Sequence, residues 1–464
     1  MRAVDRGSWW RHHGRCLLVE DVMPPKIVAV LAGLLLFAGC GEEQRVRPIT
    51  AAAEGAVAWS PTARLSTGVE LEAPAVGIAA SGAALAVFAE SDSYTDTTRA
   101  LSLAAAPAGQ PFGTTRVLSD DATAPALAVS ADGQAVLSYL RNPNGPDRQA
   151  VLVRGNVDGS FGEPVAFGRA DAPDMLALAA DGTVVAVTES FRGRHLRVDV
   201  RSIPANGRPG ASRELGPVDL SSAGALAVGT DGTVAVVFLE DRSRGPDRVR
   251  VAVRVPGGPL HVSTAMEGRL AAPQVAVGPG GRIAVVATHV EDRGEAAAYG
   301  GVVVAERRPG ARHFGATITA PVTPRRHPYA FNPTVAYGAH GRRVVAWVAD
   351  ADPGDTEGEA EDSRGASFIW TRGRPQRLDR TTRVVTLVGT EKGVLALTDS
   401  GPWQAFAVEQ TTARHVAAPA GEASAYATSA VSDRVLLASP ARLIFAFVGT
   451  RPERVAAATA ILAP

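Results

Sequence analysis

The sequence predicts an all-β fold, a β-propeller of four-stranded antiparallel blades, and two observations lead to this prediction. The first is a pattern of about 50 residues that recurs from residue 74 to the end of the chain. The second is that no stretch after residue 50 has the sustained 3.6-residue apolar period of an amphipathic helix. Small antiparallel sheets that are repeated around an axis explain both observations. This arrangement also leaves each sheet only short, protected edges.

Each repeat begins with a small residue or proline, followed by an apolar strand, a tight turn and a second apolar strand. The first strand and turn read PAVGIAASG (74–82), PALAVSADG (125–133), PDMLALAADG (173–182), GALAVGTDG (224–232), PQVAVGPGG (273–281) and PTVAYGAHG (333–341), with weaker copies VTLVGTEKG ending at Gly393 and YATSAVSDR ending at Arg434. The separations of successive turn positions along the chain are 51, 49, 50, 49, 60, 52 and 41. This regularity indicates a repeat architecture.

The repeat that begins at Pro125 shows how each unit divides into strands. It contains ALAVS, QAVLSYL, RQAVLVRG and a last strand near PVAFG, and the first two strands flank Asp132-Gly133. Asp-Gly between alternating apolar runs is a strong hairpin signal, because glycine accepts the positive φ that such turns require. Four strands of about five to seven residues with their turns fill about 50 residues.

Blade number follows from length. The range 56–464 is long enough for about eight units of roughly 50 residues. We therefore prefer eight blades, with seven as the alternative because the final unit is the least regular. The segment Val57–Ser66 precedes the first repeat, and we expect it to complete the last blade and close the ring. Two stacked smaller β-domains are a third arrangement, which the even spacing disfavours.

Residue sizes agree with these strand positions. The first strands are small and aliphatic, as expected where blades converge. The second strands end in larger residues, namely Phe88, Tyr139, Phe238 and Trp347. We expect these aromatic side chains to pack between neighbouring blades; carbohydrate binding is the alternative.

Residues 1–39 are predicted to be an N-terminal extension and a signal peptide. Ile27–Ala38 is an unbroken apolar run, too short to span a bilayer but as long as the apolar core of a secretory signal. The segment Leu36–Cys40 resembles a bacterial lipobox, which implies lipidation of Cys40. The polar residues that follow indicate a tether over residues 40–55, and the repeats place the propeller at 56–464. Residues 1–22 fit a signal poorly, so we expect translation to start at Met23. An ordinary cleaved signal or an N-terminal anchor helix remains the alternative.

Composition and missing motifs restrict the function. Lys+Arg and Asp+Glu both number 47, so we expect no nucleic-acid partner. The only cysteines are Cys16 and Cys40, so the mature domain has no disulfide. The sequence has no zinc-type histidine pair, Gly-x-Ser-x-Gly elbow or Walker-type Gly-Lys-Ser/Thr, and His195, His289 and His327 are isolated. We therefore expect no cofactor, and a binding protein is favoured over an enzyme.

The segments after the second strands are charged and are predicted to be long loops on one face. They run from Glu90 to Arg99, Arg141 to Arg148, Glu189 to Arg194, Glu240 to Arg248, Glu291 to Glu295 and Asp350 to Arg364. Binding residues concentrate on loops held by a rigid scaffold. The candidate binding-face residues are Glu90, Arg148, Glu189, Arg194, Glu240, Arg248, Glu291 and Asp350. A ring of carboxylates could bind a cation or a cationic ligand; the alternative is a set of surface ion pairs of little individual energy.

Seven acidic residues lie between Asp350 and Asp362, in the longest of these segments. Calcium favours oxygen-rich loops, but the EF-hand pattern is absent because Asp355 occupies the position of its glycine. We therefore expect a solvated loop without metal, with calcium as the alternative.

The repeat resembles those of bacterial secreted β-propellers, and the chain as a whole resembles a propeller-type lipoprotein over residues 56–464. The turns lack the Thr-Trp of sialidase Asp-boxes, because Ser130-Ala131-Asp132-Gly133 is not followed by these residues, and they lack the Trp-Asp of WD40 blades. The resemblance implies a monomer that is exported and held by a lipid on the outer side of the cytoplasmic membrane, in the periplasm or at the cell surface. We expect a binding or scaffolding module for a protein, peptide or glycan, including envelope assembly as a special case. A cell-surface glycan hydrolase or lyase is the alternative.

Overall fold

The computed structural model describes much of the repeat region, and all described residues belong to one unit, Val46–Pro464. They span residues 57–462, except for 60–62, 67–69, 72–73, 92–98, 146, 169–174, 193–194, 207–209, 219–223, 241–244, 294–295, 322–328, 339, 351–364, 383–384, 400–402, 410–411, 417, 419–433, 439–441 and 451–452. The expectations for residues 1–39, the start at Met23, the tether 40–55 and lipidation of Cys40 lie outside this part. Within it, no helix has the length and apolar character needed to cross a bilayer.

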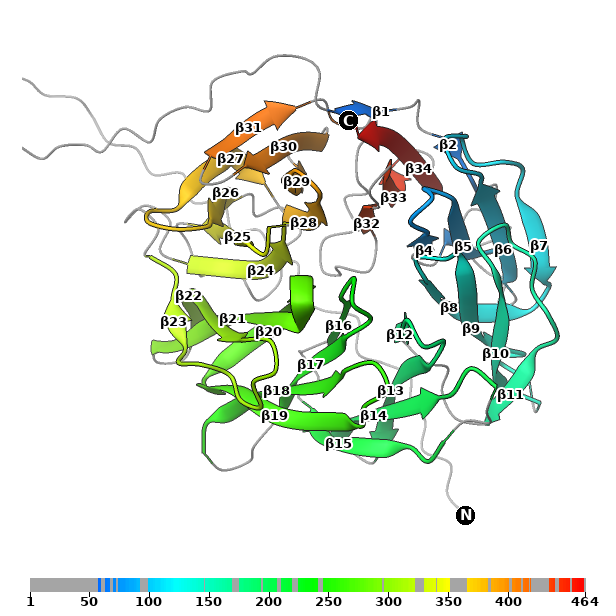
Figure 1. Ribbon diagram of the computed structural model, residues 1–464, viewed down its shortest axis with the longest axis horizontal. Coiled ribbons are helices and arrows are strands. Elements are labelled where there is room, and N and C mark those ends of the chain that lie inside the picture. Colours follow the sequence, from blue (N-terminus) through cyan, green and yellow to red (C-terminus); the bar gives the residue numbers. More distant parts are fainter. Residues whose placement is uncertain are drawn as a thin grey trace, which may run out of the picture. The chain divides into compact units, whose positions relative to one another are not determined.

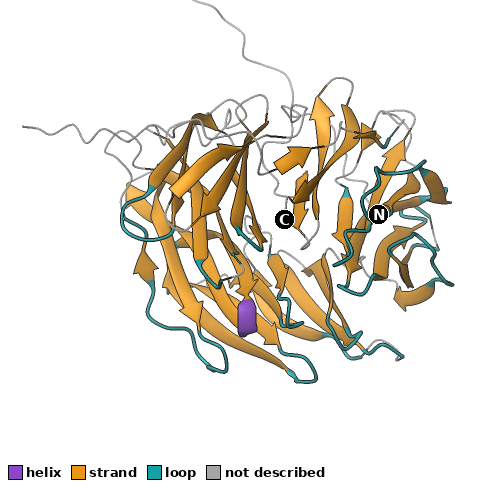
Figure 2. Ribbon diagram, turned by 45° about the horizontal axis from the view of Figure 1, so that its top comes forward, coloured by secondary structure: helices purple, strands orange, loops and turns teal. Residues whose placement is uncertain are grey.

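Antiparallel strands of about 50-residue repeats make up the fold, and the single helix described is the 3-10 turn η1 (Pro279–Gly281), drawn in purple in Figure 2. Repeats 1 to 4 contain β4 (Ala75–Ile78), β5 (Ala84–Ser91), β6 (Ala100–Ala106) and β7 (Arg116–Ser119); β8 (Ala122–Val129), β9 (Gln134–Arg141), β10 (Gln149–Asn156) and β11 (Val165–Gly168); β12 (Met175–Leu178), β13 (Val184–Arg192), β14 (His195–Ile203) and β15 (Arg213–Val218); β16 (Ala225–Val228), β17 (Val234–Glu240), β18 (Asp247–Arg254) and β19 (Leu260–Gly268).

The second half of the unit follows the same plan. Repeats 5 to 8 contain β20 (Leu270–Gly278), β21 (Arg282–Arg293), β22 (Ala296–Arg307) and β23 (Ile318–Thr319); β24 (Tyr329–Tyr337), β25 (Arg343–Asp350), β26 (Gly365–Trp370) and β27 (Gln376–Thr382); β28 (Val385–Thr390), β29 (Gly393–Asp399), β30 (Trp403–Glu409) and β31 (Thr412–Val416); β32 (Arg434–Ala438), β33 (Arg442–Thr450) and β34 (Glu453–Leu462).

The repeats form a closed ring, the architecture of a β-propeller (Figure 1). The first strand of each repeat contacts the first strand of the next, and β32 contacts both β28 and β4, which closes the circle. Among the described residues, hydrogen bonding groups the strands into seven sheets, which fits a count of seven blades. One of these sheets has eight strands, because the single pair Val218–Glu240 joins the ladders of repeats 3 and 4. Eight is therefore the number of sequence repeats, and seven is the number of separate sheets.

Ring closure uses the N-terminal end of the unit, as the sequence predicts. Strand β1 (Val57–Trp59) pairs antiparallel with β34 and becomes the outermost strand of the last sheet. Strand β2 (Ala63–Arg64) pairs with the same strand further along. The sheet order β1-β34-β33-β32 thus combines the two ends of the unit, so neither end leaves an unpaired repeat.

The strand assignment of the last repeat was wrong in the sequence analysis. The segment ending at Arg434 was expected to hold the first strand and its turn, but the first strand, β32, begins at Arg434. It pairs with β33, and the turn lies between Ala438 and Arg442. Both RVLLA and RLIFAFVGT are apolar, whereas YATSAVSD is only weakly so, and the contacts of β32 with the first strands β28 and β4 favour the more apolar segment.

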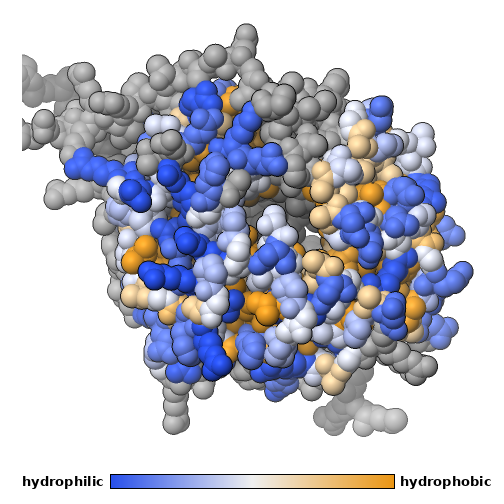
Figure 3. Space-filling model, viewed as in Figure 1, coloured by the Kyte–Doolittle hydropathy of each residue, from blue (hydrophilic) through white to orange (hydrophobic). Residues whose placement is uncertain are grey.

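The core lies between neighbouring sheets, where the aromatic residues of the second strands are buried. Phe88 and Phe238 are 0% exposed, Trp347 is 1% exposed and Tyr139 is 3% exposed. Each belongs to an apolar cluster that joins two successive repeats. Their predicted role as packing residues is confirmed. On the face seen in Figure 3, hydrophilic side chains predominate and hydrophobic ones form small patches.

Glycine conformation in the first turn of the repeats also agrees with the sequence analysis. Gly133, Gly182 and Gly232 have φ of +89°, +73° and +79°. A Cβ at Gly232 would lie 2.8 Å from the Ala180 Cβ and 2.9 Å from its backbone nitrogen, so the turn also packs closely against the preceding repeat. A side chain here would be both strained and obstructed.

Three first strands contain a β-bulge that the sequence analysis did not identify. The residue before proline has positive φ in β8 (Ala124, 52°), β20 (Ala272, 48°) and β24 (Asn332, 49°). The pairing register of each strand shifts at this point. A bulge bends the strand that carries it, and the Ala-Pro and Asn-Pro pairs at the repeat starts are its sequence signal here.

Candidate functional site

The strand connections divide the ring into two faces. In repeat 2, Val129 pairs with Ala135 beside a short turn at one end of the sheet, and Arg141 pairs with Gln149 at the other end. We call the first end, which carries the first-to-second and third-to-fourth turns, the tight-turn face. The opposite end, which carries the second-to-third connections, is the loop face. The candidate binding residues within the described part of the chain belong to the loop face.

The recurring acids lie at the ends of the second strands. Glu90, Glu240 and Asp350 are at or next to the last residues of β5, β17 and β25. Glu189 and Glu291 lie inside β13 and β21, paired with Val198 and Ala298. Of these five acids, the structure describes the side chains of Glu90 and Glu240 only.

Two of the expected long loops are instead parts of strands. Strand β13 continues to Arg192 and β21 to Arg293, so only residues 193–194 and 294–295 lie between the paired strands. The ladder is formed by backbone N–H and C=O groups, so charged residues can also take part in a paired hairpin. Arg194 and His327 lie outside the described residues, whereas His195 begins β14 and His289 is exposed on β21.

The described loop-face residues are already paired with each other. The Arg250 guanidinium donates to Glu240 Oε2 at 3.0 Å, and the Arg248 Nε donates to Glu267 Oε1 at 2.7 Å. Glu90 is buried, with 9% exposure, and Arg148 is exposed. Glu240 therefore contributes an ion-paired carboxylate to this face, in agreement with the surface-pair interpretation at this position.

A metal centre is not formed by the residues that can be placed. Among these residues, no group of three or more His, Cys, Asp or Glu side chains could hold an ion. The acidic segment from Asp350 to Asp362, for which calcium was the alternative, lies almost wholly in the undescribed range 351–364. Its metal binding stays a prediction.

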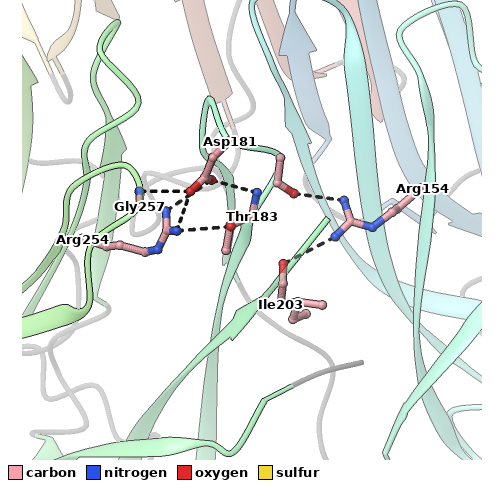
Figure 4. Close-up of polar contacts among 7 residues, drawn as sticks. Arg154, Asp181, Thr183, Ile203, Arg254 and Gly257 are labelled. Carbon is pink, nitrogen blue, oxygen red and sulfur yellow. Dashed lines mark hydrogen bonds and ion pairs between the residues drawn. The ribbon is translucent and has the colours of Figure 1, made fainter. Parts of the chain in front are cut away.

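The tight-turn face contains a polar junction between repeats 3 and 4 in which the arginine is buried and the carboxylate is partly exposed (Figure 4). Arg254, at the end of β18, donates to Asp181 Oδ2 at 2.7 Å and to Thr183 Oγ1 at 3.2 Å. The backbone N–H of Gly257 donates to the same Asp181 oxygen at 3.1 Å, and Thr183 N–H donates to Asp181 Oδ1 at 3.0 Å. The Arg254 side chain is only 8% exposed. Asp181 therefore joins two repeats by charge-assisted hydrogen bonds.

Electrostatics at this junction favour the ionised carboxylate. The hydrogen bond from Arg254 is the largest cause that lowers the pKa of Asp181 well below its ordinary value, and the N–H groups of Thr183 and Gly257 add to it. Burial acts in the opposite direction but is outweighed. The junction is consequently charged at any pH near neutrality.

A second junction joins repeats 2 and 3 through carbonyl oxygens (Figure 4). Arg154, near the end of β10, donates to Gly182 O at 3.3 Å and to Pro204 O at 3.0 Å. Burial lowers the pKa of Arg154. Together with Arg254, this side chain fixes both turns of repeat 3 to its neighbours.

Sequence analysis missed both arginines, although signals for them exist. Asp-Gly-Thr occurs at 181–183 and 231–233, and an arginine follows each copy one and a half repeats later, at Arg254 and Arg307. A Phe-Gly pair also recurs, at 112–113, 161–162 and 314–315. Each glycine N–H of these pairs donates to a carbonyl of the third strand, Ala105, Arg154 or Glu306, at 2.8–2.9 Å. The Phe-Gly pair therefore marks the connection between the third and fourth strands.

Comparisons with known proteins identify no family. No protein-family model matches the chain, and no curated protein matches it. A protein of unknown function from Dyadobacter fermentans has 10% identity and a TM-score of 0.42, over 88% of this chain and 100% of that one. The acylaminoacyl peptidase of Pyrococcus horikoshii has 10% identity and a TM-score of 0.43, over 75% of this chain and 52% of that one, so the chain spans about half its length. The endosialidase of phage phi92 has 9% identity and a TM-score of 0.44, over 91% of this chain and 72% of that one.

Proposed function

We propose that the protein is an exported, lipid-anchored β-propeller that binds a protein, peptide or glycan through its loop face. The fold supplies a rigid ring of repeated sheets. The proposal assigns recognition to the connections at one end of these sheets and a supporting role to the other end.

The difference between the two faces is the observation that carries this proposal. Between the second and third strands, the connections have eight residues in repeat 1, seven in repeat 2, six in repeat 4 and fourteen in repeat 6, but only two or three in repeats 3, 5, 7 and 8. On the tight-turn face, the first-to-second turns have two to five residues and the third-to-fourth connections two to ten, so neither set reaches the fourteen residues found on the loop face. Arg254 and Arg154 bond turns of the tight-turn face to the neighbouring repeats. Variable loops on a fixed scaffold are the usual way to present binding residues.

Anchoring is proposed to occur at Cys40, outside the described residues. Val57, where β1 begins, follows Cys40 by 17 positions. At no more than about 3.6 Å per residue, this tether could reach about 60 Å from the membrane. That length would let the loop face meet partners beyond the lipid surface. Mass spectrometry of the wild-type protein should find a fatty acid on Cys40, and Cys40→Ala should lack it; an unmodified wild type would refute the anchor.

Affinity capture from cell-envelope extracts tests the binding role. We expect the full chain to retain a specific partner and a variant with residues 92–98 and 241–244 replaced by Gly/Ser to lose it. Asp132→Asn, an exposed change on the tight-turn face, is the matched control and should retain the partner. Equal capture by both variants, or no specific partner for the wild type, would contradict the proposal.

The rival function, a glycan hydrolase or lyase, predicts a different result from a single substitution. Most glycosidases need two carboxylates about 5 to 9.5 Å apart. Glu240 is the candidate on the loop face, where Arg250 holds its carboxylate at 3.0 Å. Turnover of a glycan library that disappears in Glu240→Gln and persists in Asp132→Asn would favour the enzyme. Under the binding proposal, neither the wild type nor the variant turns over any glycan.

A further inference from the structure

Positive charge is concentrated at the first-to-second turns of repeats 5 and 6 and the third-to-fourth turn of repeat 5. Among the described residues at these turns (279–283, 306–313, 338 and 340–343), Glu306 is the one acid, whereas arginine occurs at Arg282, Arg307, Arg308, Arg312, Arg342 and Arg343. The whole chain, by contrast, has equal numbers of acidic and basic residues. Arg282 and Arg343 both act electrostatically on the Tyr337 phenol, which places them close to the same point. These turns form a basic region in an otherwise neutral protein.

Glu306 compensates only one of these arginines. It accepts a hydrogen bond from the Tyr337 hydroxyl at 2.9 Å and pairs with Arg343 at 3.3 Å. Arg343 also lies over the Trp370 ring, 4.9 Å from its centroid. Within the described part of the chain, the other five arginines form no ion pair. An excess of positive charge on one face raises the local concentration of anions.

Arg307 differs from the other four because it is buried. It is 8% exposed, and its Nε has no hydrogen-bond partner among the described residues. In the ladder it pairs with Ile283, which packs in the apolar cluster shared with repeat 4, so Arg307 lies on the side of the sheet that faces repeat 4. Burial lowers the pKa of Arg307, since no carboxylate offsets the loss of water. A guanidinium in such surroundings favours any oxyanion that reaches it.

The equivalent arginine of the preceding repeat shows which chemistry this position accepts. In the strand ladders, Arg254 lies opposite Val234 just as Arg307 lies opposite Ile283. The Arg254 guanidinium donates to the Asp181 carboxylate at 2.7 Å. At the next junction, the corresponding carboxylate, Asp231, accepts hydrogen bonds from the N–H and hydroxyl of Thr233, each at 3.0 Å, and forms no hydrogen bond or ion pair with Arg307. The carboxylate found at one junction is therefore not supplied at the other.

We propose that Arg307 anchors an oxyanion-binding site on the tight-turn face, between repeats 4 and 5, and that the exposed arginines Arg282, Arg308 and Arg312 draw the anion to it. The ligand is a phosphate-like group, from either free phosphate or an anionic lipid headgroup. Bidentate donation by guanidinium suits such a group. The site is separate from the loop face, so it stands whether or not the loop face binds a partner.

Titration of the full chain in neutral detergent with inorganic phosphate, at ionic strength held constant with KCl, tests the site. We expect saturable binding by calorimetry that Arg307→Met weakens at least tenfold and Arg308→Met, its exposed neighbour, only two- to threefold. Because Arg307 has no partner among the described residues, Arg307→Met should fold, which its unchanged circular dichroism spectrum would confirm. Equal binding by wild type and Arg307→Met, or no binding by the wild type, would overturn the proposal.

Two further arms separate the alternatives. If Arg307 instead pairs with Asp231 in solution, only Asp231→Asn binds phosphate and the wild type does not, which also overturns the proposal. Cosedimentation of Cys40→Ser with phosphatidylglycerol vesicles, compared with phosphatidylcholine vesicles, identifies the source. Loss of this cosedimentation in Arg307→Met assigns the site to lipid headgroups. Unchanged cosedimentation in Arg307→Met, together with phosphate binding by the wild type that this substitution weakens, assigns the site to free phosphate.

Discussion

The Asp181–Arg254 junction offers the sharpest test of how the ring is held together. Replacement of Asp181 by Asn keeps the size of the side chain but removes the charge that Arg254 meets at 2.7 Å. The Arg254 side chain is 8% exposed and cannot regain full hydration without moving. The hydrogen bonds from Thr183 and Gly257 to the same side chain also weaken.

The expected cost follows from the burial of the two partners. Removing one member of a buried ion pair costs about 3–5 kcal/mol. Asp181 is 32% exposed, and Arg254 keeps its bond to Thr183 Oγ1, so we expect a loss of about 2–3 kcal/mol in the free energy of unfolding. Asp132→Asn is the matched control, because Asp132 occupies the same turn position in repeat 2 but bonds only Ser130 and Gln134. Its cost should be about 0.5 kcal/mol or less.

Urea denaturation of the full chain in detergent, followed by tryptophan fluorescence at several pH values, measures both effects. The folded pKa of Asp181 is lowered, so its contribution is complete above the unfolded value of about 3.9 and is lost as pH falls below it. The difference between wild type and Asp181→Asn should therefore be constant from pH 6 to 8, at about 2–3 kcal/mol, and shrink below about pH 4. Equal stability of Asp181→Asn and Asp132→Asn at neutral pH would refute the reasoning.

Three other perturbations test the packing, the closure and the turns. Phe238 is 0% exposed between repeats 3 and 4, and Phe238→Ala should lower the free energy of unfolding, measured by urea denaturation, by about 3–5 kcal/mol. Val165 is 56% exposed, and Val165→Ala should lower it by less than about 0.5 kcal/mol; similar losses would contradict the assigned core. Deletion of residues 57–59 removes β1 from β34, so hydrogen-exchange mass spectrometry should show lost protection in Glu453–Leu462 but not in β17; unchanged protection would argue against closure by β1. At Gly232, φ is +79° and an added Cβ would lie 2.8–2.9 Å from atoms of Ala180, so Gly232→Ala should lower the melting temperature. At Gly109, φ is +70° and nothing lies within 4 Å, so Gly109→Ala should cost only about 1 kcal/mol and lower the melting temperature less; equal effects would show that the close contact is unimportant.

Local periodicity was enough to predict the fold and its closure. Alternating apolar residues with Asp-Gly turns define the hairpins, and the small first strands with larger residues at Phe88 and Trp347 show which strands face the centre and which pack between sheets. The segment before the first repeat matched no unit of its own, which correctly indicated that it completes another sheet. Each of these features depends on neighbours in sequence.

Features that depend on contacts between repeats could not be predicted in the same way. Arg254 and Asp181 are separated by one and a half repeats, and only the ring brings them together. The charged residues at the ends of β13 and β21 were interpreted as loops because charge suggests solvent, yet their backbone continues the hairpin ladder. The first strand of the last repeat was assigned too early in the sequence, because a weakly apolar segment that ends at Arg434 resembled the first strands of the other repeats. A test for residues that recur at a spacing of one and a half repeats would have found the arginine junctions.

Hydrogen exchange with and without a captured partner tests the central claim most directly, because it reports both faces of the ring at once. The account predicts new protection in the peptides that contain residues 92–99, 142–148 and 241–246, with the turns around Asp181 and Gly232 unchanged. Protection confined to the tight-turn face, or spread equally over both faces, would contradict the assignment of recognition to the loop face.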